Sequence, residues 1–187
     1  ILLVPVLFSC VKEGAYADYV DTSIGVLDDR ASNCVIGPQL PYGSINPSPQ
    51  TENGSMDGYH PDYPIRGFGQ LHVSGTGWSS YGHFLISPMT GLEVGLKDHD
   101  SEHSGDFTRP YLYKTHLDRY GIGVEIAPSH YSAIYRFTFP ESEEAVLLFD
   151  AAHSIVGDIA SEMTGSKAVE NSVDVDPQTN TVRMKLC

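Results

Sequence analysis

The sequence predicts an all-β fold, an antiparallel β-sandwich. Residues 119–126 and 130–139 alternate between apolar and polar side chains. Alternation with a period of two and one apolar face is typical of a half-buried antiparallel strand. Clusters of turn residues separate such stretches, and only residues 159–169 could form a short helix. Because alternation leaves one face of each sheet polar, two sheets packed face to face are the simplest way to bury the apolar faces.

The other expected elements follow from local composition. In chain order they are a first strand or its approach at 16–24, a polar loop at 27–33, a buried strand at 81–87 closed by Pro88, a polar loop at 97–109, an apolar strand at 145–149, and a final hairpin with strands at 173–175 and 182–186. Turn-rich loops fill most of the space between residues 39 and 64. We interpret residues 11–187 as one sandwich domain.

Composition limits the class of partner. Apolar residues make up 41% of the 187 residues and charged residues only 19%, which favours a packed core over disorder. A formal net charge of -13 disfavours nucleic acids and anionic membrane surfaces as partners. Neutral partners, such as sugars or peptides, remain open. The three cysteines, Cys10, Cys34 and Cys187, are an odd number without a Cys-x-x-Cys pair, so they predict neither a disulfide framework nor a zinc ribbon.

The first ten residues are an apolar run that ends in Leu7-Phe8-Ser9-Cys10. We interpret residues 1–10 as the second part of a bacterial lipoprotein signal peptide, with cleavage leaving Cys10 as a lipidated N-terminus. A buried first strand is the alternative. The signal interpretation predicts a lipid-anchored protein in the periplasm or at the cell surface, in the outer membrane of a Gram-negative bacterium.

A long stretch from Cys34 to Pro88 contains seven of the twelve prolines, together with glycines and aromatic residues. Such a stretch in an ordered chain is more often a site than a linker. Its centre, Ser74-Gly75-Thr76-Gly77, lacks the lysine of a phosphate loop and the glycine spacing of a nucleophile elbow. Glycines that let backbone donors approach a ligand, with His72 nearby, are typical of a sugar site, and a tight strand connection explains the pattern equally well. Trp78 could stack on a pyranose or lie in the core.

Metal and acid–base patterns are weak. The sequence contains no His-Glu-x-x-His motif of a metalloprotease, and the acidic clusters at Asp28-Asp29 and 98–106 do not match a calcium loop. Nothing marks two carboxylates as the acid and base that glycoside hydrolysis needs. A metal-dependent β-barrel enzyme stays a third possibility, which bound zinc or iron would reveal.

Three ordered segments resemble one known family. They are Tyr19-Val-Asp-Thr-Ser-Ile-Gly25, Val35-Ile-Gly-Pro-Gln-Leu-Pro-Tyr-Gly-Ser-Ile-Asn-Pro-Ser-Pro49 and Gly67-Phe-Gly-Gln-Leu-His-Val-Ser-Gly-Thr-Gly77. Together with the 113–139 region they are similar to the N-terminal domain of glycoside hydrolase family 92, the bacterial calcium-dependent α-mannosidases. The resemblance covers about residues 16–153.

The resemblance implies an N-terminal β-sandwich followed by an (α/α)6 barrel, which is absent from this chain. It implies exo-acting, inverting hydrolysis that trims mannose from N-glycans or mannan, with calcium as cofactor. The catalytic acid and base and most calcium ligands belong to the barrel, so no catalytic residue carries over, and this chain alone is expected to be inactive. The alternative is a non-catalytic carbohydrate-binding surface lipoprotein.

The resemblance also implies where this chain meets mannose-containing glycans. The loop that closes the sugar pocket matches part of the glycine-rich centre, and two earlier residues match it less closely. The implied substrate-binding residues are Asn33, Cys34, His72, Ser74, Gly75, Thr76, Gly77 and Trp78. Family members often have cysteine where this chain has Trp78, so linkage preference does not carry over.

Overall fold

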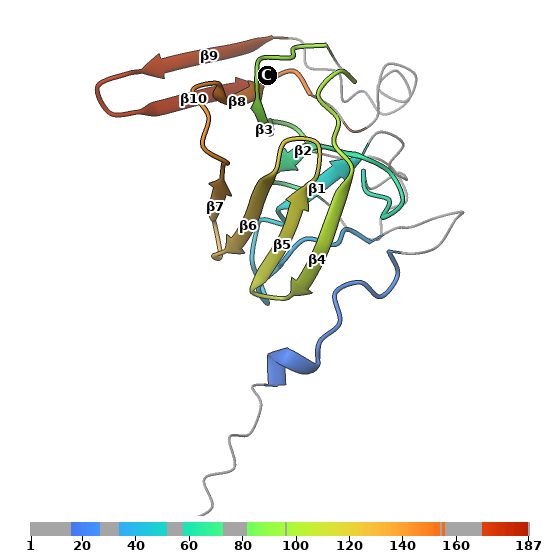
Figure 1. Cartoon of the computed structure of the whole chain (residues 1–187). Coiled ribbons are helices and arrows are strands. Elements are labelled where there is room, and N and C mark those ends of the chain that lie inside the picture. The colour runs from blue at the N-terminus through green and yellow to red at the C-terminus, as the bar shows by residue number, and fades with distance from the viewer. Residues whose placement is uncertain are drawn as a thin grey trace, which may run out of the picture.

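The computed structural model describes residues 16–26, 34–51, 58–72, 82–95, 97–153, 155 and 170–186. These residues form two four-stranded antiparallel sheets and a separate hairpin (Figure 1). The first sheet has the order β1 (Ser48–Thr51), β2 (Ile65–Gly69), β3 (Leu85–Thr90) and β8 (Ala145–Asp150). The second is a meander of β4 (His103–Arg109), β5 (Leu112–Leu117), β6 (Ile122–Pro128) and β7 (Ala133–Thr138). β9 (Asn171–Asp176) and β10 (Thr181–Leu186) pair only with each other among the described strands.

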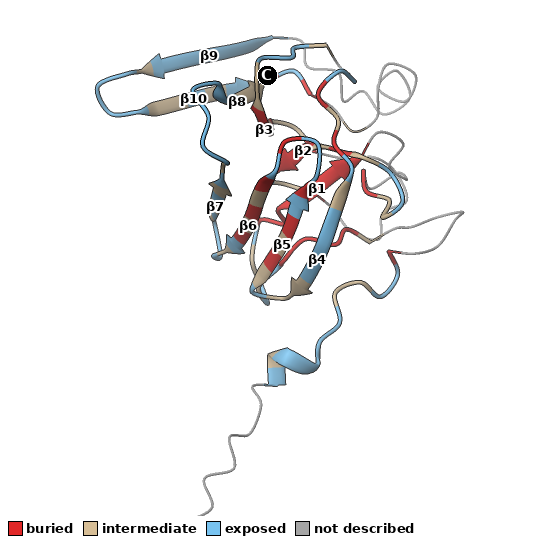
Figure 2. Ribbon diagram, in the orientation of Figure 1, coloured by how far each residue is buried: buried red, intermediate tan, exposed pale blue. Residues whose placement is uncertain are grey.

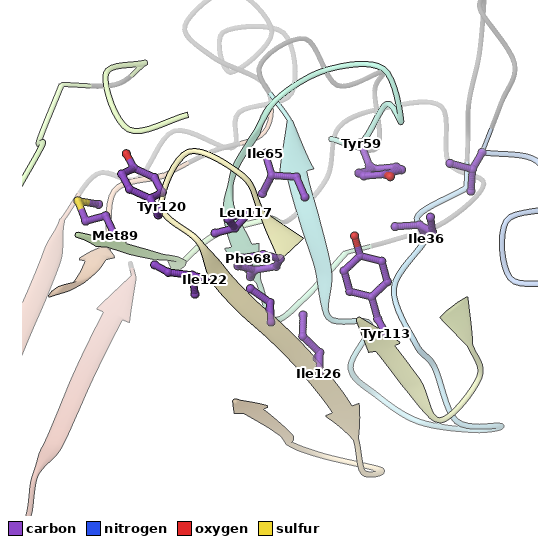
Figure 3. Packing of buried hydrophobic residues seen from close by; sticks show 12 residues of the cluster. Ile36, Tyr59, Ile65, Phe68, Met89, Tyr113, Leu117, Tyr120, Ile122 and Ile126 are labelled. Atoms are coloured by element: carbon purple, nitrogen blue, oxygen red, sulfur yellow. The ribbon is translucent and has the colours of Figure 1, made fainter. Parts of the chain in front are cut away.

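The two four-stranded sheets share one hydrophobic core. In β6, Ile122, Val124 and Ile126 are buried, whereas Gly123 and Glu125 between them are more accessible. Phe68 of β2 lies among these side chains and those of β5 (Figure 3). Figure 2 shows the same contrast over the described residues, with the buried residues gathered where the sheets face each other. The predicted all-β sandwich is therefore confirmed, and no α-helix occurs in the described ranges.

Several predicted strands are confirmed with shifted ends, and others were missed. The alternating stretches became β6 and β7, the apolar stretch became β8, and the final hairpin is β9–β10. The predicted end of a strand at Pro88 is wrong, since β3 continues to Thr90. β2 pairs with β3 at Phe68 and Ile86 only, so the missing N–H of Pro88 interrupts no ladder on that side.

Two other expectations are also wrong. The predicted first strand at 16–24 is a 3-10 helix, η1 (Tyr16–Tyr19), followed by a turn. The Asp21 carboxylate accepts hydrogen bonds from Ser23 N and Oγ at 2.9 and 2.6 Å, and such a local bond competes with strand pairing. The polar loop predicted at 97–109 contains β4, which is polar because it lies at a sheet edge and is largely exposed.

The predicted loop at 27–33 and the possible helix at 159–169 lie outside the described residues. Within the described part, no helix has the length and apolar character needed to span a membrane.

Candidate functional site

Only two of the predicted site residues, His72 and Cys34, lie in the described part of the chain. The others lie outside it: Cys10, Asn33, Ser74, Gly75, Thr76, Gly77 and Trp78. Cys34 is partly buried and packs against the hydrophobic core, close to Gly25. The sugar-contact prediction for these residues stays a prediction, and the geometry around His72 is where the structure adds information.

His72 follows β2 and is buried, with 3% of its surface exposed. Its Nδ1 lies 3.0 Å from the backbone carbonyl oxygen of Asn46, and its Nε2 lies 3.0 Å from Gln50 Nε2. A carbonyl only accepts, so Nδ1 carries the proton and Nε2 accepts from the amide. Burial lowers the pKa of His72 to about 4, against the opposing hydrogen bond to Asn46. The ring is therefore neutral at physiological pH, with both nitrogens in use.

Gln50 of β1 is the centre of this arrangement and is 2% exposed. Its amide nitrogen donates to His72 Nε2 and, at 3.0 Å, to the backbone carbonyl of Gly82. Its Oε1 accepts a short hydrogen bond from His153 Nε2. The side-chain amide thus joins three segments that are distant in sequence.

His153 follows β8 and is also buried. Burial lowers its pKa to about 4, although the Asp150 carboxylate, 4.0 Å from Nδ1, opposes the shift. The backbone carbonyl of His153 accepts a hydrogen bond of 3.0 Å from His83 Nδ1. We call Gln50, His72, His83 and His153 the Gln50 cluster.

The Gln50 cluster connects the residues on either side of the segment 73–81, which itself lies outside the described residues. Gly82 N donates to Leu71 O at 2.7 Å, so the chain segments before and after 73–81 are hydrogen-bonded to each other. His72 and Gly82 also bind the same amide. Asn46 Oδ1 is buried next to this cluster and has no hydrogen-bond partner among the described residues. These groups present a compact polar base, well suited to fixing a loop and poorly suited to proton transfer near neutral pH.

A second, partly buried cluster, which we call the Asp106 cluster, lies on the meander. Asp106 Oδ2 is 2.8 Å from His103 Nδ1, and its Oδ1 accepts from the Tyr113 hydroxyl at 2.8 Å. The Tyr59 ring completes the cluster, 6.3 Å from the His103 ring. Burial alone would lower the pKa of His103 and raise that of Asp106, but the close contact of the two side chains and their opposite charges outweigh it. The histidine pKa is raised and the carboxyl pKa is lowered, which describes a structural ion pair.

Most of these residues carry no local signal in the sequence. Gln50, His83 and His153 have no recognisable spacing, and His103 and Asp106 lie in a segment interpreted as a loop. Among the described residues, no group of three or more His, Cys, Asp or Glu side chains could hold a metal ion. The calcium implied by the family resemblance therefore has no such site on this part of the chain, and it stays a prediction.

Comparison with known proteins gives a consistent result. The family model described as "Glycosyl hydrolase family 92 N-terminal domain" matches residues 19–184. The chain is similar to the GH92 α-mannosidase BT3965 from Bacteroides thetaiotaomicron, with 31% identity and a TM-score of 0.66, covering 74% of this chain and 20% of that one. The structure of that enzyme with mannoimidazole gives 33% identity over the same coverage.

A third solved structure, the GH92 glycosyl hydrolase ccman5, has 22% identity and a TM-score of 0.74 over 91% of this chain and 24% of its own, which supports the fold alone. No curated protein matches. The chain spans about a fifth to a quarter of the length of these structures.

Proposed function

Because the chain belongs to glycoside hydrolase family 92, as its N-terminal domain, we propose that it forms one wall of the mannose pocket of an exo-acting, inverting α-mannosidase. The observation that carries this proposal is the family match over residues 19–184 together with 31% identity to an α-mannosidase. N-glycans or mannan are the proposed substrates. The net charge of -13 disfavours anionic partners and is compatible with neutral partners such as these glycans.

In the complete protein, this domain and the additional region have different roles. The similar solved chains are four to five times longer than the part that this chain covers. We place the catalytic acid and base, and most of the calcium ligands, in that additional region. Two carboxylates of this chain already have structural partners: Asp106 binds His103, and Asp100 forms a two-point ion pair with Arg66 at 3.0 Å. The role of this domain is to bind and orient the sugar.

Activity measurements test the division of labour. We expect the 187-residue chain to release no mannose from a mannosylated N-glycan, while the complete gene product releases it and loses activity in a calcium chelator. Inversion predicts that β-mannose is the first anomer seen by NMR. Steady turnover by the 187-residue chain alone would contradict the proposal.

Two variants of the complete gene product test the pocket assignment. His72→Ala and Trp78→Ala are each expected to lower kcat/KM by about tenfold or more, because both belong to the loop and its base. If neither changed kcat/KM by more than about threefold, the loop would be structural only.

We also propose lipidation of Cys10, which would anchor the protein in the outer membrane of a Gram-negative bacterium. Cells fed a labelled fatty acid should label the wild-type protein and not Cys10→Ala.

The alternative function, a non-catalytic carbohydrate-binding lipoprotein, predicts mannoside binding by the 187-residue chain in calorimetry, and a complete gene product without turnover.

A further inference from the structure

The hydrogen bonds of the Gln50 side chain have only one consistent direction. The Gly82 carbonyl can only accept, so the amide nitrogen faces it, and the same nitrogen supplies its second proton to His72 Nε2. The amide oxygen then faces His153 Nε2, which donates. Every polar atom of the Gln50 side chain is therefore assigned, and reversing the amide would place like groups against each other at all three contacts.

Two glycines leave the room that this amide occupies. A Cβ on Gly69 would lie 2.9 Å from Gln50 Nε2 and 2.9 Å from His72 Cε1. A Cβ on Gly82 would also come within 2.9 Å of Gln50 Nε2 and would overlap with Ile155. Gly82 has φ +72, a conformation that favours glycine. The Gln50 amide therefore fits closely between Gly69 and Gly82, on either side of the 73–81 segment in the sequence.

We propose that Gln50 is the positioning residue of the mannose pocket, holding His72 and Gly82 in a fixed geometry, and that His72 supports the pocket without contacting the sugar. This inference rests on the proposed function, and it assigns a role to a residue outside the glycine-rich motif. A sugar hydroxyl could bind His72 only by displacing Gln50 or the Asn46 carbonyl from a nitrogen. Both bonds are buried, where an unpaired polar group is costly.

The charge state of the cluster follows from its surroundings. The titratable and charged groups that act on His153 are Asp150, Arg66, His72 and His83, and the pKa of His72 itself is set by burial and by Asn46. Only Asp150 favours a positive charge here, and burial outweighs it. His72 and His153 are thus neutral, and their hydrogen bonds to Gln50 are constant over the physiological range.

Gln50→Glu is the most informative variant, because it replaces the donating nitrogen with an acceptor of the same shape. At about pH 8 the introduced carboxylate faces the lone pair of His72 Nε2 and the Gly82 carbonyl, and both bonds are lost. At about pH 5 a protonated His72 can donate to the introduced carboxylate, which restores one of them. Gln178→Glu, at an exposed position in the β9–β10 turn, is the matched control.

The kinetic test uses the complete gene product and 4-nitrophenyl α-mannoside as the probe. Gln50→Glu is expected to raise KM about tenfold at about pH 8, with recovery toward about pH 5, while Gln178→Glu stays within about twofold throughout. A purely structural role would lower the active fraction, and therefore kcat, without recovery at acidic pH. Wild-type KM and pH profile in Gln50→Glu would overturn the proposal.

A second readout does not depend on catalysis. Trp78 is the only tryptophan of the 187-residue chain, so in a measurement on this chain by itself its fluorescence reports on the segment between His72 and Gly82. The wild-type emission should change near pH 4, where His72 titrates, and Gln50→Glu should move that transition upward by about one pH unit or more. An upward shift with unchanged KM would overturn the mannose-pocket role and retain Gln50 as the anchor of the segment. If neither the KM nor the pH of the fluorescence transition changed, both the mannose-pocket role of Gln50 and its role as the anchor of the segment would be overturned.

His153→Phe provides a second variant if Gln50→Glu fails to fold by circular dichroism. It leaves residues 72 and 82 intact but removes the hydrogen-bond partner of Gln50 Oε1, so the amide is held from one side only. A raised KM is again expected, and a wild-type KM would overturn the proposal.

Discussion

The Gln50 cluster and the Asp106 cluster both enclose histidine side chains, and the pKa values of His72 and His153 in the first shift in the opposite direction to that of His103 in the second. Burial lowers the pKa of His72 and His153 to about 4, whereas the pKa of His103 is raised. The difference lies in the group at the centre. A neutral amide can satisfy a neutral imidazole but offers no compensation for a buried charge, while a carboxylate stabilises the charged ring.

Because of this difference, the contributions of the two clusters to folding stability depend on pH in opposite ways. Histidines with lowered pKa bind protons only after unfolding, so their fold loses stability as pH falls from about 6.5 toward 4. In the Asp106 cluster the lowered carboxyl pKa contributes stability above about pH 4, and the raised imidazole pKa contributes it below about pH 6.5. The ion pair is therefore strongest between these limits, where the Gln50 cluster weakens.

The largest effect is expected for Asp106→Ala. It leaves the Tyr113 hydroxyl and a largely buried His103 without their acceptor, which should cost about 2–4 kcal/mol of unfolding free energy at about pH 5. Urea denaturation at about pH 5 and about pH 8 measures it. The cost should fall at the higher pH as His103 loses its proton, and an equal cost at both would contradict the ion-pair description. Asp174→Ala, at an exposed ion pair, is the control.

The next effect tests the Gln50 cluster. His72→Gln replaces a group that must stay neutral with one that cannot be charged, so the acid-induced loss of stability should become smaller. At about pH 4.5 the expected difference from wild type, relative to about pH 7, is about 2 kcal/mol. His116→Gln, at an exposed histidine, should leave the profile unchanged. If the unfolding free energies of the wild type and of His72→Gln changed with pH in parallel, His72 would not be held neutral.

The smallest effect is expected at the surface. Glu125 lies between Lys114 and Arg136, at 2.6 and 3.0 Å, on the solvent-exposed side of the meander. Its hydrogen bonds to these cations lower its pKa, as the His103 contact does for Asp106, but both cations reach into solvent, where water and salt screen the pairs. Glu125→Gln should change the melting temperature only slightly, and added salt should remove the change. A loss of stability comparable to that of Asp106→Ala would mean that burial of the cationic partner does not explain the different stability contributions of the two sites.

These clusters also mark the limit of prediction from the sequence. β6 and β7 were predictable because one face of each strand packs on the core and the other meets solvent, which leaves an alternating pattern. β1 has all four residues buried, including Pro49 and Gln50, so no alternation exists to find. β4 is polar for the opposite reason, since it is an exposed edge.

The same reasoning applies to the site. The composition of the glycine-rich segment pointed to its neighbour His72, whose role in sugar contact stays a prediction. Gln50 and His153 acquire their roles only through hydrogen bonds between residues 50 and 153, and nothing local encodes a contact over that separation. The hydrogen-bonding pattern of the Gln50 cluster had to come from the tertiary structure.

The pairing of β3 with β8 also has a consequence for how the chain folds. Thr90 pairs with Ala145, across the whole β4–β7 meander, and closing a loop of that length costs about 3.5 kcal/mol in chain entropy. The meander has only local pairings, so we expect it to form first and β8 to dock late. Pulsed hydrogen exchange would then protect β5 and β6 amides before those of β3, and simultaneous protection would contradict this order. Until β8 docks, Gln50 Oε1 lacks the His153 partner, so completing the fold and completing the Gln50 cluster would be one event.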